Sequence, residues 1–234
     1  MTPADMPVAI IAGGLATRLR PITEQIPKSL VEVAGEPFLG HQLRLLRRSG
    51  IRKVVICAGY LAGHIEEFAG DGSRFDLEIR YSLDGDQLRG TGGALQSALP
   101  LLGSAFLTLY GDSYLPVDYL AVARYFLGTS KQGLMTVFRN NGRWNSSNVE
   151  FGDGRILTYD KRICSERMEH IDYGLGAFRS AAFDLLRTKG PQDLASLYQD
   201  LLARDQLAAF EVHERYYEVG SLSGIDELNS YLTQ

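Results

Sequence analysis

The chain has 234 residues, of which 45% are hydrophobic and 22% charged, and its formal net charge is −4. These values are typical of one globular domain. A negative net charge does not favour binding to nucleic acid or to a membrane surface. No apolar run approaches the roughly 18 residues of a membrane span, and the N-terminus lacks the pattern of a secretory signal. The two cysteines, Cys57 and Cys164, fit a reducing compartment. We therefore expect a cytoplasmic monomer or homodimer that binds neither nucleic acid nor membrane.

Strands and helices alternate through the first half, to about residue 130. Apolar runs predict strands, whereas apolar residues at helical spacing predict amphipathic helices. The alternation favours an α/β fold with a doubly wound, mostly parallel sheet, in which ligands bind beyond the carboxyl ends of the strands. Strands are expected at 8–12, 53–58, 77–82 and 105–110, and helices at 37–49, 61–68, 91–99 and 117–127.

The regular alternation of strands and helices ends after about residue 130. Short strands are now separated by strong turn signals such as Asn140-Asn141-Gly142. We expect a small antiparallel insertion laid against the first half, and a single domain over 1–234 with two halves, about 1–130 and about 131–234. Strands are expected at 134–139, 149–151, 156–161, 171–178, 208–213 and 216–219, and helices at 181–187, 193–204 and 224–232.

The stretch after the first strand carries the first candidate site. Gly13 and Gly14 let the backbone turn sharply, and consecutive N–H groups in such a turn form a nest for an anion. Arg18 adds a planar fork of donors, and Lys28, whose direction Pro27 restricts, adds a mobile charge. Each feature alone fits a tight turn with solvated charges. Their combination at one strand end favours a phosphate site, although neither the P-loop nor the dinucleotide pattern is present.

This stretch resembles the signature of the sugar-1-phosphate nucleotidyltransferases, G-G-x-G-T-R-L-x-P-x-T-x-x-x-P-K-x-L. The chain departs from it at Ala16, where the family usually has glycine. The resemblance implies a Rossmann-like nucleotidyltransferase fold, nucleotide binding by Ala12, Gly13, Gly14, Ala16 and Thr17, and catalytic roles for Arg18 and Lys28. The matching positions are Gly13, Gly14, Thr17, Arg18, Leu19, Pro21, Thr23, Pro27, Lys28 and Leu30.

A second glycine-rich element, Gly90-Thr91-Gly92-Gly93, precedes an expected helix. This element has two interpretations. It either only begins the helix, or its backbone lies against a flat ring of a ligand. The family carries a similar G-T-[GA]-G element in its nucleobase pocket, so the resemblance implies nucleotide binding by Gly90 and Thr91. Gln87, Leu88 and Arg89 stand where the family often has Glu-Pro-Leu. Gln87 is included because its amide can both donate and accept hydrogen bonds.

Two carboxylates are candidate metal ligands. Asp112 follows Gly111 at a strand end, where it could cap a helix or bind a metal, and the family has a Mg²⁺-binding aspartate in this Gly-Asp pair. Glu218 stands where the family has the aspartate of Asp-[Val/Ile]-Gly-Thr; the alternative is a solvent-facing glutamate. We predict that Asp112 and Glu218 converge on one Mg²⁺ site.

The second half is expected to hold the sugar. Lys161 matches a family lysine that contacts the sugar phosphate, which makes it the third candidate catalytic residue. Asp172 and Gly174 align with an Asn-x-Gly element that contacts sugar hydroxyls, with aspartate here in place of asparagine. Asn148 and Asp160 complete the sugar-binding candidates, although exposed turns would also explain both.

The implied reaction is transfer of a nucleotidyl group from a nucleoside triphosphate to a sugar 1-phosphate, with release of pyrophosphate and with Mg²⁺ as cofactor. Guanylyl transfer, with GDP-heptose as product, ranks narrowly first. The alternatives are a uridylyl- or cytidylyltransferase acting on another sugar or alcohol phosphate, and a non-catalytic nucleotide-sensing module. The halves 1–130 and 131–234 would then bind the nucleotide and the sugar, respectively.

Overall fold

The computed structural model describes residues 1–14, 19, 21–85, 89–186 and 191–233. The predicted site residues Ala16, Thr17, Arg18 and Gln87 lie outside these residues. Among the described residues, nine strands form one sheet, and no helix is long and apolar enough to cross a membrane.

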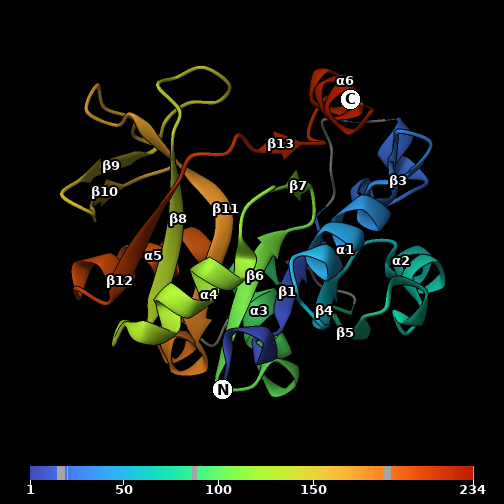
Figure 1. Cartoon of the computed structure of the whole chain (residues 1–234), viewed down its shortest axis with the longest axis horizontal. Coiled ribbons are helices and arrows are strands. Elements are labelled where there is room, and N and C mark those ends of the chain that lie inside the picture. The colour runs from blue at the N-terminus through green and yellow to red at the C-terminus, as the bar shows by residue number, and fades with distance from the viewer. Residues whose placement is uncertain (15–18, 20, 86–88, 187–190, 234) are drawn as a thin grey trace.

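Four parallel strands form the first half of this sheet, as predicted (Figure 1). The first strand, β1, lies between β4 and β6, and β5 forms the edge. The bounds of these strands are Val8–Ile11 (β1), Lys53–Ala58 (β4), Glu78–Leu83 (β5) and Ala105–Tyr110 (β6).

The second half continues the same sheet. Strand β11 runs antiparallel to β6 on one side and to β8 on the other, and β12 pairs in parallel with β8. The hairpin of β9 and β10 joins the start of β11, so the antiparallel strands extend the sheet instead of forming a layer of their own. The bounds are Gly133–Arg139 (β8), Val149–Gly152 (β9), Arg155–Tyr159 (β10), His170–Arg179 (β11) and Leu207–Val212 (β12).

Helices cover both faces of the sheet, which explains why its strands read as continuous apolar runs. Val8 and Ile10 of β1 belong to one core, together with α1, α2 and α4, whereas Ala9 belongs to a second core, together with α3 and α5. The helices are Phe38–Arg48 (α1), Ala62–Ala69 (α2), Gly90–Leu102 (α3), Tyr119–Gly128 (α4) and Leu194–Ala203 (α5). Short 3₁₀-helices span Pro3–Asp5, Ile22–Glu24, Lys28–Leu30, Ser73–Phe75 and Ser180–Leu185, so the helix expected at 181–187 is a 3₁₀-helix.

A third, smaller core attaches the C-terminal segment to the beginning of the chain. Helix α6 (Leu222–Leu232) packs with Ile225 and Leu228 against Leu19, Val31 and Phe38. The strand expected at 216–219 is reduced to β13 (Tyr217–Glu218), which pairs antiparallel with β7 (Ser113–Tyr114) outside the main sheet. A second short pair joins β2 (Glu32–Val33) to β3 (Glu36–Pro37). This arrangement brings residues 217–220 beside the end of β6.

Candidate active site

A cavity of about 330 Å³ lies at the carboxyl ends of β1 and β6. Parallel strands present their ligand sites at this edge of a sheet, so the location agrees with the sequence-based expectation. Of the predicted site residues, Ala12, Gly14, Lys28, Thr91 and Asp112 line it together.

The turn after β1 is fixed by backbone contacts with its two neighbouring strands. The N–H of Ala12 donates to the carbonyl of Cys57 (2.8 Å), and the N–H of Gly111 donates to the carbonyl of Ile11 (2.9 Å). A Cβ atom on Gly111 would lie 2.8 Å from that same carbonyl, so only glycine allows the end of β6 to approach β1 this closely. A Cβ atom on Gly14, in contrast, would meet no described heavy atom within 4 Å.

Lys28 and Asp112 form an ion pair inside the cavity. The Lys28 Nζ lies 2.5 Å from Asp112 Oδ2, and their side chains are 15% and 31% exposed. Pro27, with φ −62° and ψ 148°, leads into the 3₁₀-helix that begins at Lys28. The two residues are far apart in the chain, and the fold brings a cation and a carboxylate together at the carboxyl ends of β1 and β6.

Gln42 of α1 holds the turn that carries Asp112, and the sequence analysis missed it. Its side chain is fully buried, and its Nε2 donates to the carbonyls of Tyr110 (2.9 Å) and Ser113 (2.8 Å). The available signal was a glutamine on the apolar face of an amphipathic helix, between Phe38 and Leu46. Buried amides are normally hydrogen-bonded, so such a residue indicates a structural contact.

We expect Gln42→Leu to lower the free energy of unfolding by about 1–3 kcal/mol, because two buried carbonyls lose their donor. Urea denaturation would measure the loss, and activity should fall with it because Asp112 is no longer held. The control is Gln206→Leu, a half-buried glutamine just before β12, which should change stability by less than about 0.5 kcal/mol. Equal midpoints for the two variants would contradict a supporting role for Gln42.

Tyr110 connects the two halves of the site and was also missed, since it was read only as the last residue of a strand. Its hydroxyl lies 3.4 Å from Lys161 Nζ, which is 5.4 Å from the centre of its ring. Burial raises the pKa of the Tyr110 hydroxyl, and the negative charges of Asp172, Asp193, Asp112 and Glu218 raise it further. These four carboxylates come from different parts of the chain.

The backbones of the two candidate metal ligands are neighbours. The N–H of Val219 donates to the carbonyl of Asp112 (2.9 Å), and Glu218 pairs with Ser113 across β13 and β7. The Glu218 carboxylate lies 3.5 Å from the Asn145 side-chain amide. A single shared ion between Asp112 and Glu218 stays a prediction.

Asp172 and Gly174 lie where β11 bends. The register between β11 and β8 shifts after Asp172, and Gly174 has φ +101°. The N–H of Asp172 donates to Asn148 Oδ1 (2.9 Å), and the Tyr159 hydroxyl donates to Asp172 Oδ2 (3.3 Å). The bend thus gathers Asn148, Asp172 and Gly174, three of the four predicted sugar-binding residues.

The charges at this bend are partly balanced. Burial raises the pKa of the Asp172 carboxyl, and the Lys161 ammonium opposes that rise. Lys161 follows β10, which ends at Tyr159 and not at 161 as expected, so its side chain extends from a turn. Asp160 accepts hydrogen bonds from the N–H groups of Arg162 (2.7 Å) and Ile163 (3.0 Å), which lower its pKa. These contacts are those of a turn residue, and a sugar contact of Asp160 stays a prediction.

The glycine-rich start of α3 docks against the start of α5. Gly90 has φ +72°, and a Cβ atom there would lie 2.4 Å from the carbonyl of Gln192. Thr91 Oγ1 accepts a hydrogen bond from the N–H of Leu194 (2.8 Å), while Thr91 also lines the cavity. This element therefore joins the two halves of the chain beside the candidate nucleotide site.

Asp84, directly after β5, is a further carboxylate that the sequence analysis missed. It is 7% exposed, and its Oδ2 accepts a hydrogen bond from the N–H of Arg89 (3.4 Å). Its Oδ2 also lies 3.3 Å from the position of a Cβ on Gly13. Burial raises the pKa of the Asp84 carboxyl. The signal was an acidic residue at the carboxyl end of a parallel strand, as at Asp112.

A doubly wound α/β sheet with glycines, a lysine and carboxylates at the carboxyl ends of its parallel strands defines a class of proteins that bind phosphate-containing ligands. Residues 8–160 match the nucleotidyl transferase family, and the chain belongs to that family.

Two curated relatives and one solved structure illustrate the range of the family. The chain is 38% identical to N-acetylmuramate alpha-1-phosphate uridylyltransferase of Neisseria meningitidis over 117 residues, which is 50% of this chain and 51% of the relative. It is 29% identical to D-glycero-alpha-D-manno-heptose 1-phosphate guanylyltransferase of Campylobacter jejuni over 159 residues, 68% of this chain and 69% of the relative. A putative glucose-1-phosphate thymidylyltransferase from Bacillus anthracis superposes with a TM-score of 0.86 at 20% identity, covering 97% of this chain and 94% of that one. The alignment thus spans about half the length of the Neisseria protein.

Proposed function

We propose that the chain transfers a nucleotidyl group from a nucleoside triphosphate to a sugar 1-phosphate and releases pyrophosphate. The observation that carries the proposal is the pairing of Lys28 with Asp112 in the cavity at the ends of β1 and β6. The relatives support it, because both curated proteins are named for nucleotidyl transfer to a sugar 1-phosphate.

The reaction needs positioning and charge stabilisation more than covalent chemistry by the protein. A phosphate oxygen of the sugar 1-phosphate attacks the α-phosphorus in line, and the bond from that phosphorus to pyrophosphate breaks. Lys28 would stabilise the charge that develops on the α-phosphate, and Lys161, beside Tyr110, would attract the incoming phosphate. We assign stabilisation of the leaving pyrophosphate to Arg18, on the resemblance alone.

Mg²⁺ is the cofactor that we propose. Asp112 and Glu218 would hold it, since Mg²⁺ is usually bound by one or two carboxylates together with phosphate oxygens and water. Support comes from the adjacent backbones of the two residues. When bound, the ion would neutralise part of the negative charge of the phosphates.

Glu218→Gln should raise the Mg²⁺ concentration for half-maximal activity about tenfold, because a charged ligand becomes neutral. A Mg²⁺ titration of pyrophosphate release would measure this, with thermal denaturation to show that the fold is kept. The control is Glu214→Gln, an exposed glutamate near the start of β13. If Glu218→Gln gives the same Mg²⁺ titration curve as wild type, Glu218 is not a ligand of the metal.

The sugar would lie at the bend of β11. Asn148, Asp160, Asp172 and Gly174 offer hydrogen-bonding groups of fixed position, and such groups discriminate between substrates that differ in one hydroxyl. Asp172 stands in place of the family's asparagine. In its ionised form it can only accept hydrogen bonds, and in that form it would select sugar hydroxyls that donate.

Guanine is the base that we propose first. The support is the likeness to the heptose 1-phosphate guanylyltransferase of Campylobacter jejuni, which is 29% identical over 68% of this chain. Uracil is the second candidate, because the relative at 38% identity is a uridylyltransferase.

A panel of four nucleoside triphosphates against hexose, heptose and amino-sugar 1-phosphates, read out as pyrophosphate release, tests the proposal. We expect release only when a triphosphate and a sugar 1-phosphate are both present, and fastest with GTP. Nucleotide binding without release from any pair would identify a sensing module instead. Release with a small alcohol phosphate but no sugar would indicate the cytidylyltransferase alternative.

A further inference from the structure

Tyr110 stands where the two halves of the candidate active site meet. As the last residue of β6, it lines the cavity at the carboxyl ends of β1 and β6. Its ring also lies against the bend of β11, where a Cβ atom on Gly174 would be 3.5 Å from Tyr110 Cδ2. This side chain therefore connects the proposed nucleotide site with the proposed sugar site.

The backbone of Tyr110 is held by its neighbours. Strand β6 pairs with β1 on one side and with β11 on the other, and Tyr110 lies opposite Ile11 of β1. Its carbonyl accepts a hydrogen bond from Nε2 of the buried Gln42 (2.9 Å). Groups on a paired strand are placed more precisely than groups on a loop, so Tyr110 is a rigid support.

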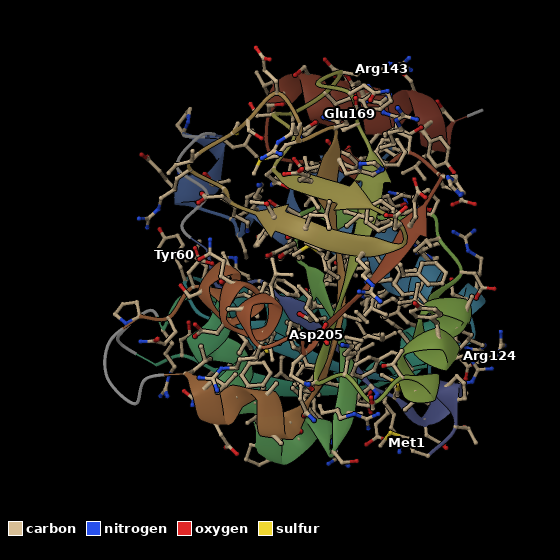
Figure 2. All side chains as sticks on the ribbon, turned by 90° about the vertical axis from the view of Figure 1, so that its left-hand side faces the viewer. Met1, Tyr60, Arg124, Arg143, Glu169 and Asp205 are labelled. Atoms are coloured by element: carbon tan, nitrogen blue, oxygen red, sulfur yellow. The ribbon has the colours of Figure 1, made fainter. Side chains whose placement is uncertain are left out.

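Lys161 lies on a loop whose two ends are also held. At the start of the loop, the N–H of Asp160 donates to the carbonyl of Asn148 (3.0 Å). At its end, two backbone N–H groups of the loop after β8 donate to the carbonyl of Glu169 (3.0 and 2.9 Å). Figure 2 shows Glu169 at the top of the molecule, beside Arg143 of that neighbouring loop. The freedom that Lys161 retains is mainly that of its own flexible side chain.

Tyr110 holds the end of this side chain. The Lys161 Nζ donates to the Tyr110 hydroxyl (3.4 Å) and lies 5.4 Å from the centre of its ring, a distance at which an ammonium is attracted by the π face. Asp172 has other partners, because its Oδ1 accepts from the N–H of Gly174 (3.1 Å) and its Oδ2 from the Tyr159 hydroxyl (3.3 Å). Among the described residues, no carboxylate forms an ion pair with Lys161.

The two candidate catalytic lysines are therefore held in different ways. The charge of Lys28 is balanced by Asp112 at 2.5 Å, whereas Lys161 is held by a phenol. Burial raises the pKa of the Tyr110 hydroxyl, so the phenol is neutral near pH 7 and leaves the lysine charge uncompensated. An ammonium has three donors, and the contact with Tyr110 uses one of them.

We propose that Tyr110 is a positioning residue, whose hydroxyl and ring hold the uncompensated ammonium of Lys161 where it meets the phosphate of the sugar 1-phosphate. The inference rests on the proposed function, in which Lys161 attracts that phosphate. Tyr110 then acts through Lys161, and a lysine that is ordered before the substrate arrives loses less side-chain entropy on binding.

NMR tests the contact without any substrate. The chain has few lysines, so protein labelled with ¹³C at the lysine Cε gives a simple spectrum, in which Lys161→Ala identifies the Lys161 signal. Relaxation of this carbon reports motion on the picosecond to nanosecond timescale. We expect the Lys161 Cε to be more ordered than that of the exposed Lys53 in wild type, and to approach the mobility of Lys53 in Tyr110→Phe. Equal order of Lys161 in wild type and Tyr110→Phe would overturn the inference.

Kinetics test the role, with the sugar 1-phosphate that wild type uses fastest in the panel. Tyr110→Phe should raise the KM of the sugar 1-phosphate about tenfold, because a hydrogen bond to a charged group is lost. The KM of the triphosphate should change by less than about twofold, which a general structural defect would not achieve. The matched control is Tyr125→Phe, an exposed tyrosine of α4 that contacts the Phe210 ring, and it should change neither KM.

A double-mutant cycle shows whether Tyr110 acts through Lys161. Lys161→Ala should lower kcat/KM for the sugar 1-phosphate about 100-fold. The double variant should be no more than about twofold worse than Lys161→Ala, because the tyrosine has nothing left to position. Independent effects would multiply to about 1,000-fold and would overturn the inference.

The outcomes separate this inference from the proposed function. Pyrophosphate release by wild type, together with multiplying losses or with equal loss for both substrates in Tyr110→Phe, would overturn the inference and leave the function standing. No release from any pair in the panel would overturn the function and, with it, the role of Tyr110, even if NMR shows the contact. An ordered Lys161, a selective rise in the KM of the sugar 1-phosphate and a coupled cycle would support both.

Discussion

Replacing Lys28 by alanine should lower kcat by about 30- to 1,000-fold, which corresponds to about 2–4 kcal/mol of lost transition-state stabilisation. The lysine Nζ lies 2.5 Å from Asp112 and only 15% of its side chain is exposed, so its charge acts in a poorly hydrated cavity. Water screens such a charge weakly, and no other described lysine or arginine lines this cavity. Pyrophosphate release at saturating substrates would measure the loss.

Two controls accompany this experiment. Lys53→Ala removes an exposed lysine at the opposite end of the parallel strands and should leave kcat unchanged. Thermal denaturation of Lys28→Ala should show a folded protein, since the Asp112 side chain is 31% exposed and its charge can be hydrated when the lysine is removed. A folded Lys28→Ala enzyme with wild-type turnover would exclude this lysine from the mechanism.

Gly90→Ala should destabilise the fold by about 2–4 kcal/mol, the largest stability effect that we expect at the site. Alanine at φ +72° is strained, and its Cβ would lie 2.4 Å from the carbonyl of Gln192, which is backbone and cannot rotate away. For a chain of this size the melting temperature should fall by roughly 5–15 °C. Thermal unfolding followed by circular dichroism would measure the shift.

The matched control for this substitution is Gly63→Ala within α2. A Cβ atom there would meet no described heavy atom within 4 Å, and alanine favours a helix, so stability should rise by about 0.5–1 kcal/mol. If Gly90→Ala melts at the same temperature as wild type, then the contact between α3 and α5 can shift without a loss of stability.

The parallel half of the fold was predictable because its signals are local. The strands expected at 53–58 and 105–110 have the bounds of β4 and β6, since their apolar runs face helices on both sides of the sheet. The shared cavity of Lys28 and Asp112 followed from two premises. One was that ligands bind at the carboxyl ends of parallel strands, and the other was the resemblance to a known signature.

The rest depends on contacts between distant segments, which periodicity does not encode. The pairing of β11 with β6, and of β13 with β7, is set by tertiary packing of strands far apart in sequence. Gln42 and Tyr110 gain their importance in the same way. Gln42 matters because it donates hydrogen bonds to the carbonyls of Tyr110 and Ser113. Tyr110 matters because its hydroxyl contacts the Lys161 ammonium.

The small core that joins α6 to the beginning of the chain has a consequence for biosynthesis. Val31 and Phe38 emerge from the ribosome long before their partners Ile225 and Leu228. Closing so long a loop is slow, and domains form native long-range contacts only when both partners have been synthesised. The sheet can therefore form on a nascent chain while Glu218 is still missing. Under the proposed function, the site would be complete only after this late segment has packed against the beginning of the chain.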